Sequence, residues 1–199
     1  MRTHKLLDVQ ALRERARKHI EDAAVTQSYG SDRVAVIEML NAALATEIVC
    51  NLRYRRHHFM ASGLHAESVA TEFLEHAQQE QAHADSIAAR IVQLGGEPDF
   101  APSTLETRSH AEYVAGNSLL DMIRENLIAE RIAIESYTEV VRFLGNDDPT
   151  TRVMLEKILA VEEEHAEDMG SLLAGMASRE PSDRRVSQPD NGARAAQPS

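Results

Sequence analysis

The sequence predicts an all-α protein with four long helices, and three observations support this. Aromatic residues make up 4% of the 199 residues and tryptophan is absent, whereas Ala, Leu, Ile, Glu and Arg dominate. This composition favours helices over strands. Apolar residues recur at helical spacing in four long stretches within residues 31–175. Two short turns and one long connection separate these stretches, so we predict a four-helix bundle of two hairpins joined by a crossover.

Each predicted helix has boundary signals. Asp32 is suited to the N-cap of the first helix, and the Gly95-Gly96 pair ends the second. Pro149 suits the first position of the fourth helix. A connection as long as residues 95–117 fits a compact domain if it crosses the bundle from end to end, which makes the second and third helices parallel. The four helices are predicted over about residues 32–60, 66–94, 118–144 and 149–174.

The two ends of the chain differ in composition from the bundle. Residues 1–30 are predicted to form an N-terminal extension with a short helix over about residues 8–24. Residues 176–199 are rich in Pro, Ser, Arg and Gln, so we expect a disordered tail. The net charge is −11, and the first 30 residues hold six Lys/Arg against four Asp/Glu. The acidic excess therefore lies in the bundle, where it attracts cations and repels nucleic acid.

Several classes of protein are disfavoured. No uninterrupted apolar run approaches the length of a membrane span, and charges occupy the N-terminal positions where a signal peptide needs an apolar core. The single cysteine excludes an intrachain disulfide framework and a four-cysteine metal site. We therefore expect a soluble, cytoplasmic protein.

The motif Glu-x-x-His occurs twice, and a lone glutamate precedes each copy at a nearly equal interval. A Glu and a His three positions apart lie on one face of a helix, so they can bind the same ion. The repeat indicates two copies of one hairpin, each with half of a site. The residues of the site are Glu47, Glu80, His83, Glu130, Glu162 and His165.

The position of these residues favours a buried site over a solvated surface. Glu80 and His83, for example, share their helix face with Phe73 and Ile87. Burying four carboxylates costs many kcal/mol unless cations compensate their charge. Four carboxylates and two imidazoles suit two iron or manganese ions, so we predict a dinuclear metal centre.

A tyrosine follows each lone glutamate by two helical turns: Tyr54 follows Glu47, and Tyr137 follows Glu130. Either tyrosine could simply pack in the core. A phenol beside a redox metal could instead have one of two roles. It could donate an electron, or it could form a hydrogen bond with a bridging glutamate.

These motifs resemble those of the ferritin-like superfamily over about residues 32–174, and most closely those of bacterioferritins, which have a symmetric dinuclear centre. The resemblance implies Fe(II) oxidation by O₂ or H₂O₂ and storage of ferric mineral in a hollow shell. Tyr54 matches the tyrosine found near that centre, so it is our candidate catalytic residue. The implied metal ligands are terminal Glu47 and Glu130, bridging Glu80 and Glu162, and one imidazole per ion from His83 and His165.

Two features depart from bacterioferritins. Gln81 and Ala82 occupy the places between Glu and His where bacterioferritins carry a haem-ligating methionine, so we expect no haem. The chain after Ala174 is polar and contains proline, whereas full-size ferritins have a fifth helix that helps to close a 24-subunit shell. Dps-like mini-ferritins lack that helix and form 12-subunit shells. The resemblance therefore favours a 12-subunit shell over a 24-subunit shell or a dimer.

Other functions stay open. The same six ligands would serve a di-iron or di-manganese peroxidase or catalase-like enzyme that stores no mineral. Glu75, His76 and Gln79, one turn before Glu80, could form an iron transit site or have ordinary surface and packing roles. A Dps-type protein that protects DNA would use basic residues near the N-terminus to contact phosphates. These are Arg2, Lys5, Arg13, Arg15, Arg17 and Lys18.

Overall fold

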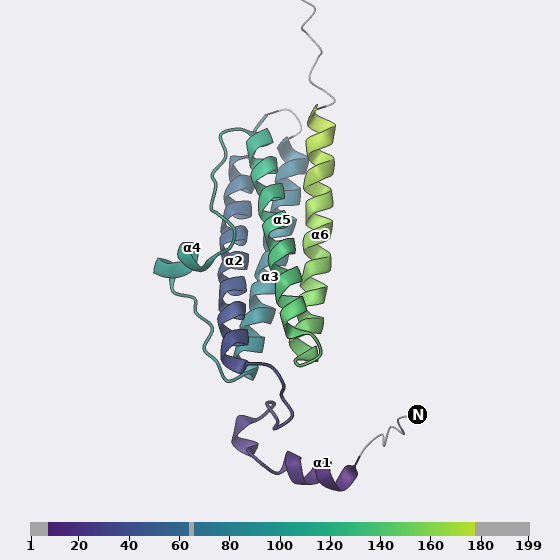
Figure 1. Ribbon diagram of the computed structural model, residues 1–199. Helices are drawn as coiled ribbons and strands as arrows, with labels where there is room; N and C mark the ends of the chain where they lie inside the picture. Colours follow the sequence, from purple (N-terminus) through teal and green to yellow (C-terminus); the bar gives the residue numbers. More distant parts are fainter. Residues whose placement is uncertain (1–7, 64–65, 178–199) are drawn as a thin grey trace, which may run out of the picture.

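The computed structural model describes residues 8–63 and 66–177, and in these residues it contains α-helices and short 3₁₀ turns but no strand (Figure 1). Four long helices form a bundle, as predicted. They are α2 (Arg33–Met60), α3 (Ala66–Gln93), α5 (Leu119–Leu144) and α6 (Pro149–Ala177).

The bundle consists of two antiparallel hairpins. α2 packs mainly on α3, and α5 packs mainly on α6. Residues 94–118 run along the outside of α2 from one end of the bundle to the other, so α3 and α5 are parallel (Figure 1). This crossover contains a 3₁₀ turn (Pro102–Thr104) and the short helix α4 (Leu105–Arg108), which the sequence did not predict.

Hydrogen bonds from arginine side chains hold the crossover against α2. Arg53 on α2 is 1% exposed, and its Nη1 donates to the carbonyl oxygen of Glu112 over 3.0 Å. Nη1 of Arg108 donates to the carbonyl oxygen of Asn41 on α2 over 3.1 Å. Because charged donors bind carbonyl oxygens more strongly than neutral ones do, these two arginines fix the path of the connection.

The predicted helix ends agree closely with the structure. The Asp32 carboxylate accepts hydrogen bonds from the N–H groups of Val34 and Ala35, so it is the N-cap of α2. After α3, Gly95 has a φ of 77°, a left-handed conformation that glycine adopts without strain, and the chain turns away. α6 continues to Ala177, three residues beyond the predicted end.

The N-terminal extension differs from the single helix predicted over residues 8–24. Helix α1 (Val9–Ala16) is separated from a 3₁₀ turn (Ile20–Asp22) by His19, which has a left-handed φ of 52°. No residue of α1 is buried, so no packing against the bundle supports a longer helix. Most of the predicted tail, residues 178–199, lies outside the described residues, as do residues 1–7.

Two large apolar clusters fill most of the bundle, and a polar layer lies between them; a third, small cluster consists of Cys50, Ala111 and Ala129. Along all four helices, the predicted metal ligands fall between residues of one cluster and residues of the other. The first cluster includes Val36, Leu40, Leu44, Ile87, Ile91, Leu144, Leu155 and Ile158. The second includes Tyr54, Val69, Phe73, Met122, Ile123 and Met169.

α2 is also long and apolar enough, by length and composition alone, to cross a membrane. However, 56% of its most apolar window is buried inside the bundle. Leu40 and Leu44 of α2, both 0% exposed, are core residues of the first cluster. The apolar character of α2 is therefore accounted for by packing within the bundle.

Candidate metal centre

The polar layer brings together all six residues that the sequence singled out. Glu47 comes from α2, Glu130 from α5, and the two Glu-x-x-His pairs come from α3 and α6. Glu130 and Glu162 are 0% exposed, and His83 is the most exposed of the six at 8%. Four helices thus contribute to one buried cluster, which has the pseudo-symmetry expected from the repeat.

The six side chains form two overlapping groups, and within each group the possible ligand atoms lie within 4.8 Å of one another. One group is Glu47, Glu80, His83 and Glu162, and the other is Glu80, Glu130, Glu162 and His165. Glu80 and Glu162 belong to both groups. This arrangement offers two neighbouring ion positions with two shared carboxylates, which is the geometry of a dinuclear centre.

The carboxylate oxygens surround both imidazoles, close enough for the same ion to contact several of these side chains. Nδ1 of His83 lies 2.9 Å from a Glu162 oxygen and 3.2 Å from a Glu47 oxygen. Nδ1 of His165 lies 3.5 Å from the other Glu162 oxygen and 3.8 Å from a Glu130 oxygen. The atoms of the cluster that are buried without a hydrogen-bond partner are Oε1 of Glu80, Oε2 of Glu130, both carboxylate oxygens of Glu162 and Nδ1 of His165.

Such buried polar atoms are costly unless something compensates them, and here the compensation must be positive charge. Four ionised carboxylates carry a charge of −4, which two divalent ions would neutralise while both imidazoles stay neutral. The donor set of carboxylate oxygens and imidazole nitrogens suits iron or manganese. The residues therefore fit a pair of such ions.

The ionisation of the cluster shows the same demand for positive charge. Burial and the neighbouring Glu80 raise the pKa of Glu47 well above its usual value. Burial and the neighbouring Glu47 likewise raise the pKa of Glu162, to about 7. Burial alone would lower the pKa of His83, but the adjacent carboxylates of Glu162 and Glu47 raise it to about 12. In the absence of metal ions, these pKa shifts therefore favour the protonated forms of these three side chains.

Gln79 fixes the orientation of one imidazole. Its Oε1 is hydrogen-bonded to Nε2 of His165, so this nitrogen carries the proton and Nδ1 is left to bind an ion. The sequence placed Gln79 in a candidate transit site with Glu75 and His76. Its contact with His165 was not predicted, because helical spacing within α3 does not show which residue of α6 lies opposite.

The two tyrosines connect the hairpins through the site. Tyr54 on α2 donates a hydrogen bond to Glu130 on α5, and Tyr137 on α5 donates one to Glu47 on α2. Both tyrosines are buried. The suggested hydrogen bond to a bridging glutamate is thus not what the structure has, since each tyrosine binds a glutamate that belongs to one group only.

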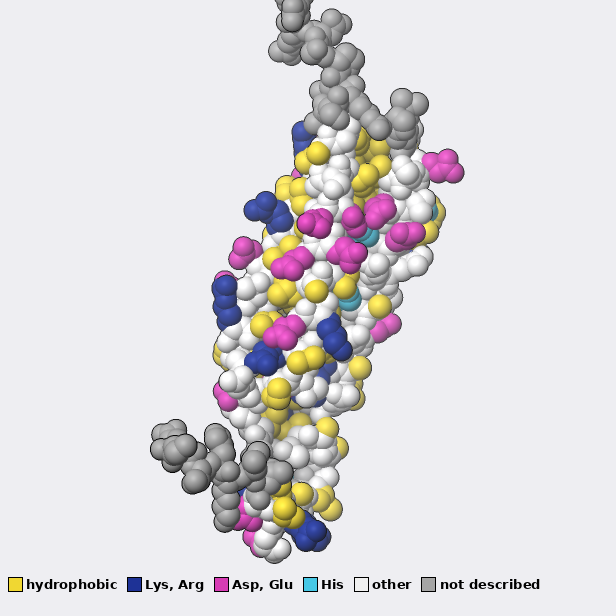
Figure 2. All heavy atoms as spheres, turned by 90° about the vertical axis from the view of Figure 1, so that its right-hand side faces the viewer, with side chains coloured by type: hydrophobic (Ala, Val, Ile, Leu, Met, Phe, Trp, Pro, Cys, Tyr) yellow, Lys and Arg dark blue, Asp and Glu magenta, His cyan; other side chains and the backbone are white. Residues whose placement is uncertain are grey.

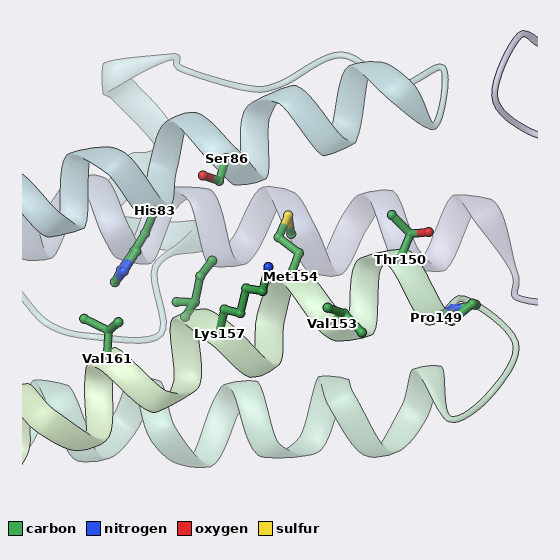
Figure 3. A pocket seen from close by; sticks show the side chains of 9 residues that line it. His83, Ser86, Pro149, Thr150, Val153, Met154, Lys157 and Val161 are labelled. Atoms are coloured by element: carbon green, nitrogen blue, oxygen red, sulfur yellow. The ribbon is translucent and has the colours of Figure 1, made fainter.

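A groove between α3 and α6 reaches the cluster at His83 (Figure 3). Val153, Met154 and Val161 of α6 make much of its lining apolar, and His83 lies at one end. The His83 side chain is 10% exposed, whereas that of Glu162 is 0% exposed. The groove thus gives small molecules a path to one edge of the buried cluster.

Known proteins resemble this chain in overall sequence and in fold. Residues 37–178 match the description Ferritin-like domain. The chain belongs to the ferritin-like family. The predicted family and its bundle fold are therefore confirmed.

Relatives of two kinds support this assignment. Bacterioferritin of Desulfovibrio desulfuricans is 29% identical over 145 residues, covering 70% of this chain and 77% of the relative. The DNA protection during starvation protein of Pyrococcus furiosus is 30% identical over 155 residues, covering 75% of this chain and 82% of the relative. The structure of a dodecameric thioferritin, the bacterioferritin-related protein of Bacteroides fragilis, has a TM-score of 0.73 and 32% identity over 75% of this chain and 90% of that chain.

Replacing Glu162 by Gln should have opposite effects on the metal-free and metal-loaded protein. Removing one of four buried carboxylates relieves repulsion, so the free energy of unfolding of the metal-free variant should rise by about 1–2 kcal/mol. The wild type should gain about 2.7 kcal/mol from each ion at a free concentration 100 times its Kd, and the variant should lose most of this gain. Thermal unfolding after chelation, with and without added Mn²⁺, measures both effects.

Glu163→Gln provides the matched control, because Glu163 is the next residue of α6 and its side chain is exposed. This control should behave like the wild type in both conditions. A Glu162→Gln variant that keeps the full response to metal would contradict the assignment of Glu162 to the centre.

Proposed function

We propose that the chain is an iron-oxidising and iron-storing protein with a di-iron carboxylate centre inside each subunit. The observation that carries the proposal is the pair of overlapping ligand groups that share Glu80 and Glu162 in a buried layer with uncompensated carboxylates. The proposed terminal ligands are Glu47 and Glu130, the bridging ligands are Glu80 and Glu162, and the imidazole ligands are His83 and His165.

The ligand set favours oxidation of its substrate, Fe(II). Carboxylates supply negative charge that stabilises Fe(III) more than Fe(II), and the imidazoles complete a hard N/O environment. Two Fe(II) ions give up two electrons, which reduce O₂ to H₂O₂, or H₂O₂ to two water molecules, with uptake of two protons. The same ligands also suit manganese. The proposal includes no haem and places the protein in the cytoplasm.

Tyr54 is the proposed catalytic tyrosine, since its hydroxyl binds the proposed ligand Glu130 directly. The groove at His83 is the proposed entry for the oxidant, because O₂ and H₂O₂ are small and uncharged and Val153, Met154 and Val161 form an apolar path. Fe(II) and the oxidant would then reach the centre from the surface of the subunit.

Replacing both shared glutamates, as Glu80→Ala/Glu162→Ala, should lower the initial rate of Fe(II) oxidation by about 100-fold or more, because each would be a ligand of both ions. Stopped-flow absorbance of Fe(III) formation in air-saturated buffer measures the rate, and circular dichroism checks that the bundle persists. The matched control is Glu75→Ala/Glu163→Ala, which removes one exposed glutamate from each of the same helices. Unchanged oxidation kinetics in the first variant would exclude the proposed centre.

Storage requires a shell, and the similarity to a dodecameric thioferritin supports a 12-subunit assembly. Native mass spectrometry should give the mass of twelve chains, and electron microscopy after aerobic Fe(II) loading should show mineral inside the particles. A dimer that oxidises iron would contradict storage and would favour the non-storage di-iron or di-manganese peroxidase or catalase-like enzyme.

Protection of DNA is a second candidate function, supported by the relatives that carry this name and by the basic residues of α1 and the turn after it. Arg13, Arg15, Arg17 and Lys18 are exposed, on a segment that projects from the end of the bundle (Figure 1). If these residues bind phosphates, the protein should retard linear DNA at low salt and lose this ability in an Arg13→Glu/Arg15→Glu/Arg17→Glu variant. An unretarded DNA band with the wild type would exclude this function.

A further inference from the structure

A further group of possible metal ligands, Glu72, His76 and Asp168, lies beside the dinuclear centre and contains none of the six residues assigned to it, although His76 also lies near Glu130 and His165. Glu72 and His76 of α3 face Asp168 of α6, and the possible ligand atoms of the three lie within 4.8 Å of one another. Acidic side chains gather on the face of the molecule that α6 presents (Figure 2). Glu72 and Asp168 have side chains that are 34% and 45% exposed, whereas that of His76 is 2% exposed.

The distances within this group match those between ligands of one metal ion. Nε2 of His76 lies 3.3 Å from an oxygen of Glu72 and 3.5 Å from an oxygen of Asp168. Two ligands at tetrahedral positions, each about 2.0–2.2 Å from an ion, are about 3.4 Å apart. Hydrogen bonds from a protonated imidazole to a carboxylate are shorter, typically about 2.7–2.9 Å. The observed spacing thus fits a metal ion better than a shared proton.

Tyr54 determines which nitrogen of His76 is free. The Tyr54 hydroxyl has a single proton, and it donates that proton to Glu130. The 3.1 Å contact between the Tyr54 oxygen and Nδ1 of His76 must therefore use the proton on Nδ1. Nε2 is then left with a lone pair, and it faces one carboxylate oxygen of Glu72 and one of Asp168. A cation between these three electron-pair donors would stabilise them.

The imidazole of His76 is held in this orientation from two sides. One edge is fixed by Tyr54, and one face stacks on the ring of His165 with centroids 3.9 Å apart and an interplanar angle of 19°. A ligand whose direction is set by packing and hydrogen bonds binds an ion without losing conformational freedom. The exposed carboxylates provide access from solvent, and the buried imidazole provides the fixed point.

We propose that Glu72, His76 and Asp168 bind a third divalent transition-metal ion, separate from the two ions of the dinuclear centre. One nitrogen and two oxygen ligands, with the remaining positions open to water, suit Fe(II), Mn(II), Co(II) or Zn(II). Binding itself does not depend on the proposed oxidation reaction, whereas the identification of Fe(II) as the natural ion rests on it. Tyr54 is hydrogen-bonded to both His76 and Glu130, so it would connect a bound ion to the dinuclear centre.

The number of ions bound by each chain tests this site. The chelated full-length protein is titrated anaerobically with Co²⁺ and, separately, with Zn²⁺ by calorimetry, and the bound metal is counted by elemental analysis after gel filtration. The wild type should bind three ions per chain. Glu72→Gln/Asp168→Asn, which changes only partly exposed side chains, should lose one ion. His76→Gln should lose the same ion. The Co²⁺ visible spectrum should then lose the contribution of that ion, whose nitrogen ligand is His76.

Two comparisons make the result specific. Glu75→Gln/Glu164→Gln removes two exposed acids from the same helices and should keep all three ions, which excludes general attraction to the acidic face. Glu80→Ala/Glu162→Ala should keep the third ion, so a failure of the dinuclear centre and a failure of this site are distinguishable. The site is disproved if Glu72→Gln/Asp168→Asn binds as many ions as the wild type.

Discussion

The mutual repulsion of four buried carboxylates is the constraint on which the rest of this structure depends. Packing alone cannot remove that repulsion, because the carboxylates lie between two apolar clusters and have little contact with water. Burial and Glu80 raise the pKa of Glu47, and the adjacent carboxylates outweigh burial and raise the pKa of His83, so both side chains favour their protonated forms when no metal ion is bound. Metal ions in the proposed centre would therefore compete with protons, which would make their affinity dependent on pH.

The same layer joins the two hairpins. Each hairpin packs mainly within itself, since α2 contacts α3 and α5 contacts α6 far more extensively than the hairpins contact each other. Across the boundary, Tyr54 binds Glu130 and Tyr137 binds Glu47. Ions that are coordinated by glutamates of both hairpins would add further links. The site is consequently part of what holds the bundle together, and its metal content should influence stability as well as activity.

The sequence could predict whatever depends on the periodicity of one helix. It placed the metal-centre residues on inward faces, and Asp32 and Gly95 marked helix ends correctly. It could not predict contacts between helices, which depend on how the helices are rotated and shifted against one another. The proposed group of Glu75, His76 and Gln79 illustrates this: Gln79 binds His165, Glu75 is exposed, and His76 faces Glu72 on α3 and Asp168 on α6.

The pseudo-symmetry of the centre is broken at one position, and this gives its two sides different chemistry. His76 precedes Glu80 by four residues, and the corresponding residue before Glu162 is Ile158. Ile158 packs in the first apolar cluster with Tyr137 and also lines the groove at His83, whose lining is mainly apolar. On the other side, His76 links Tyr54 to exposed carboxylates. The two sides of the centre thus differ. The side at Ile158 offers a mainly apolar approach that suits an uncharged oxidant, and the side at His76 offers a polar approach that suits a cation.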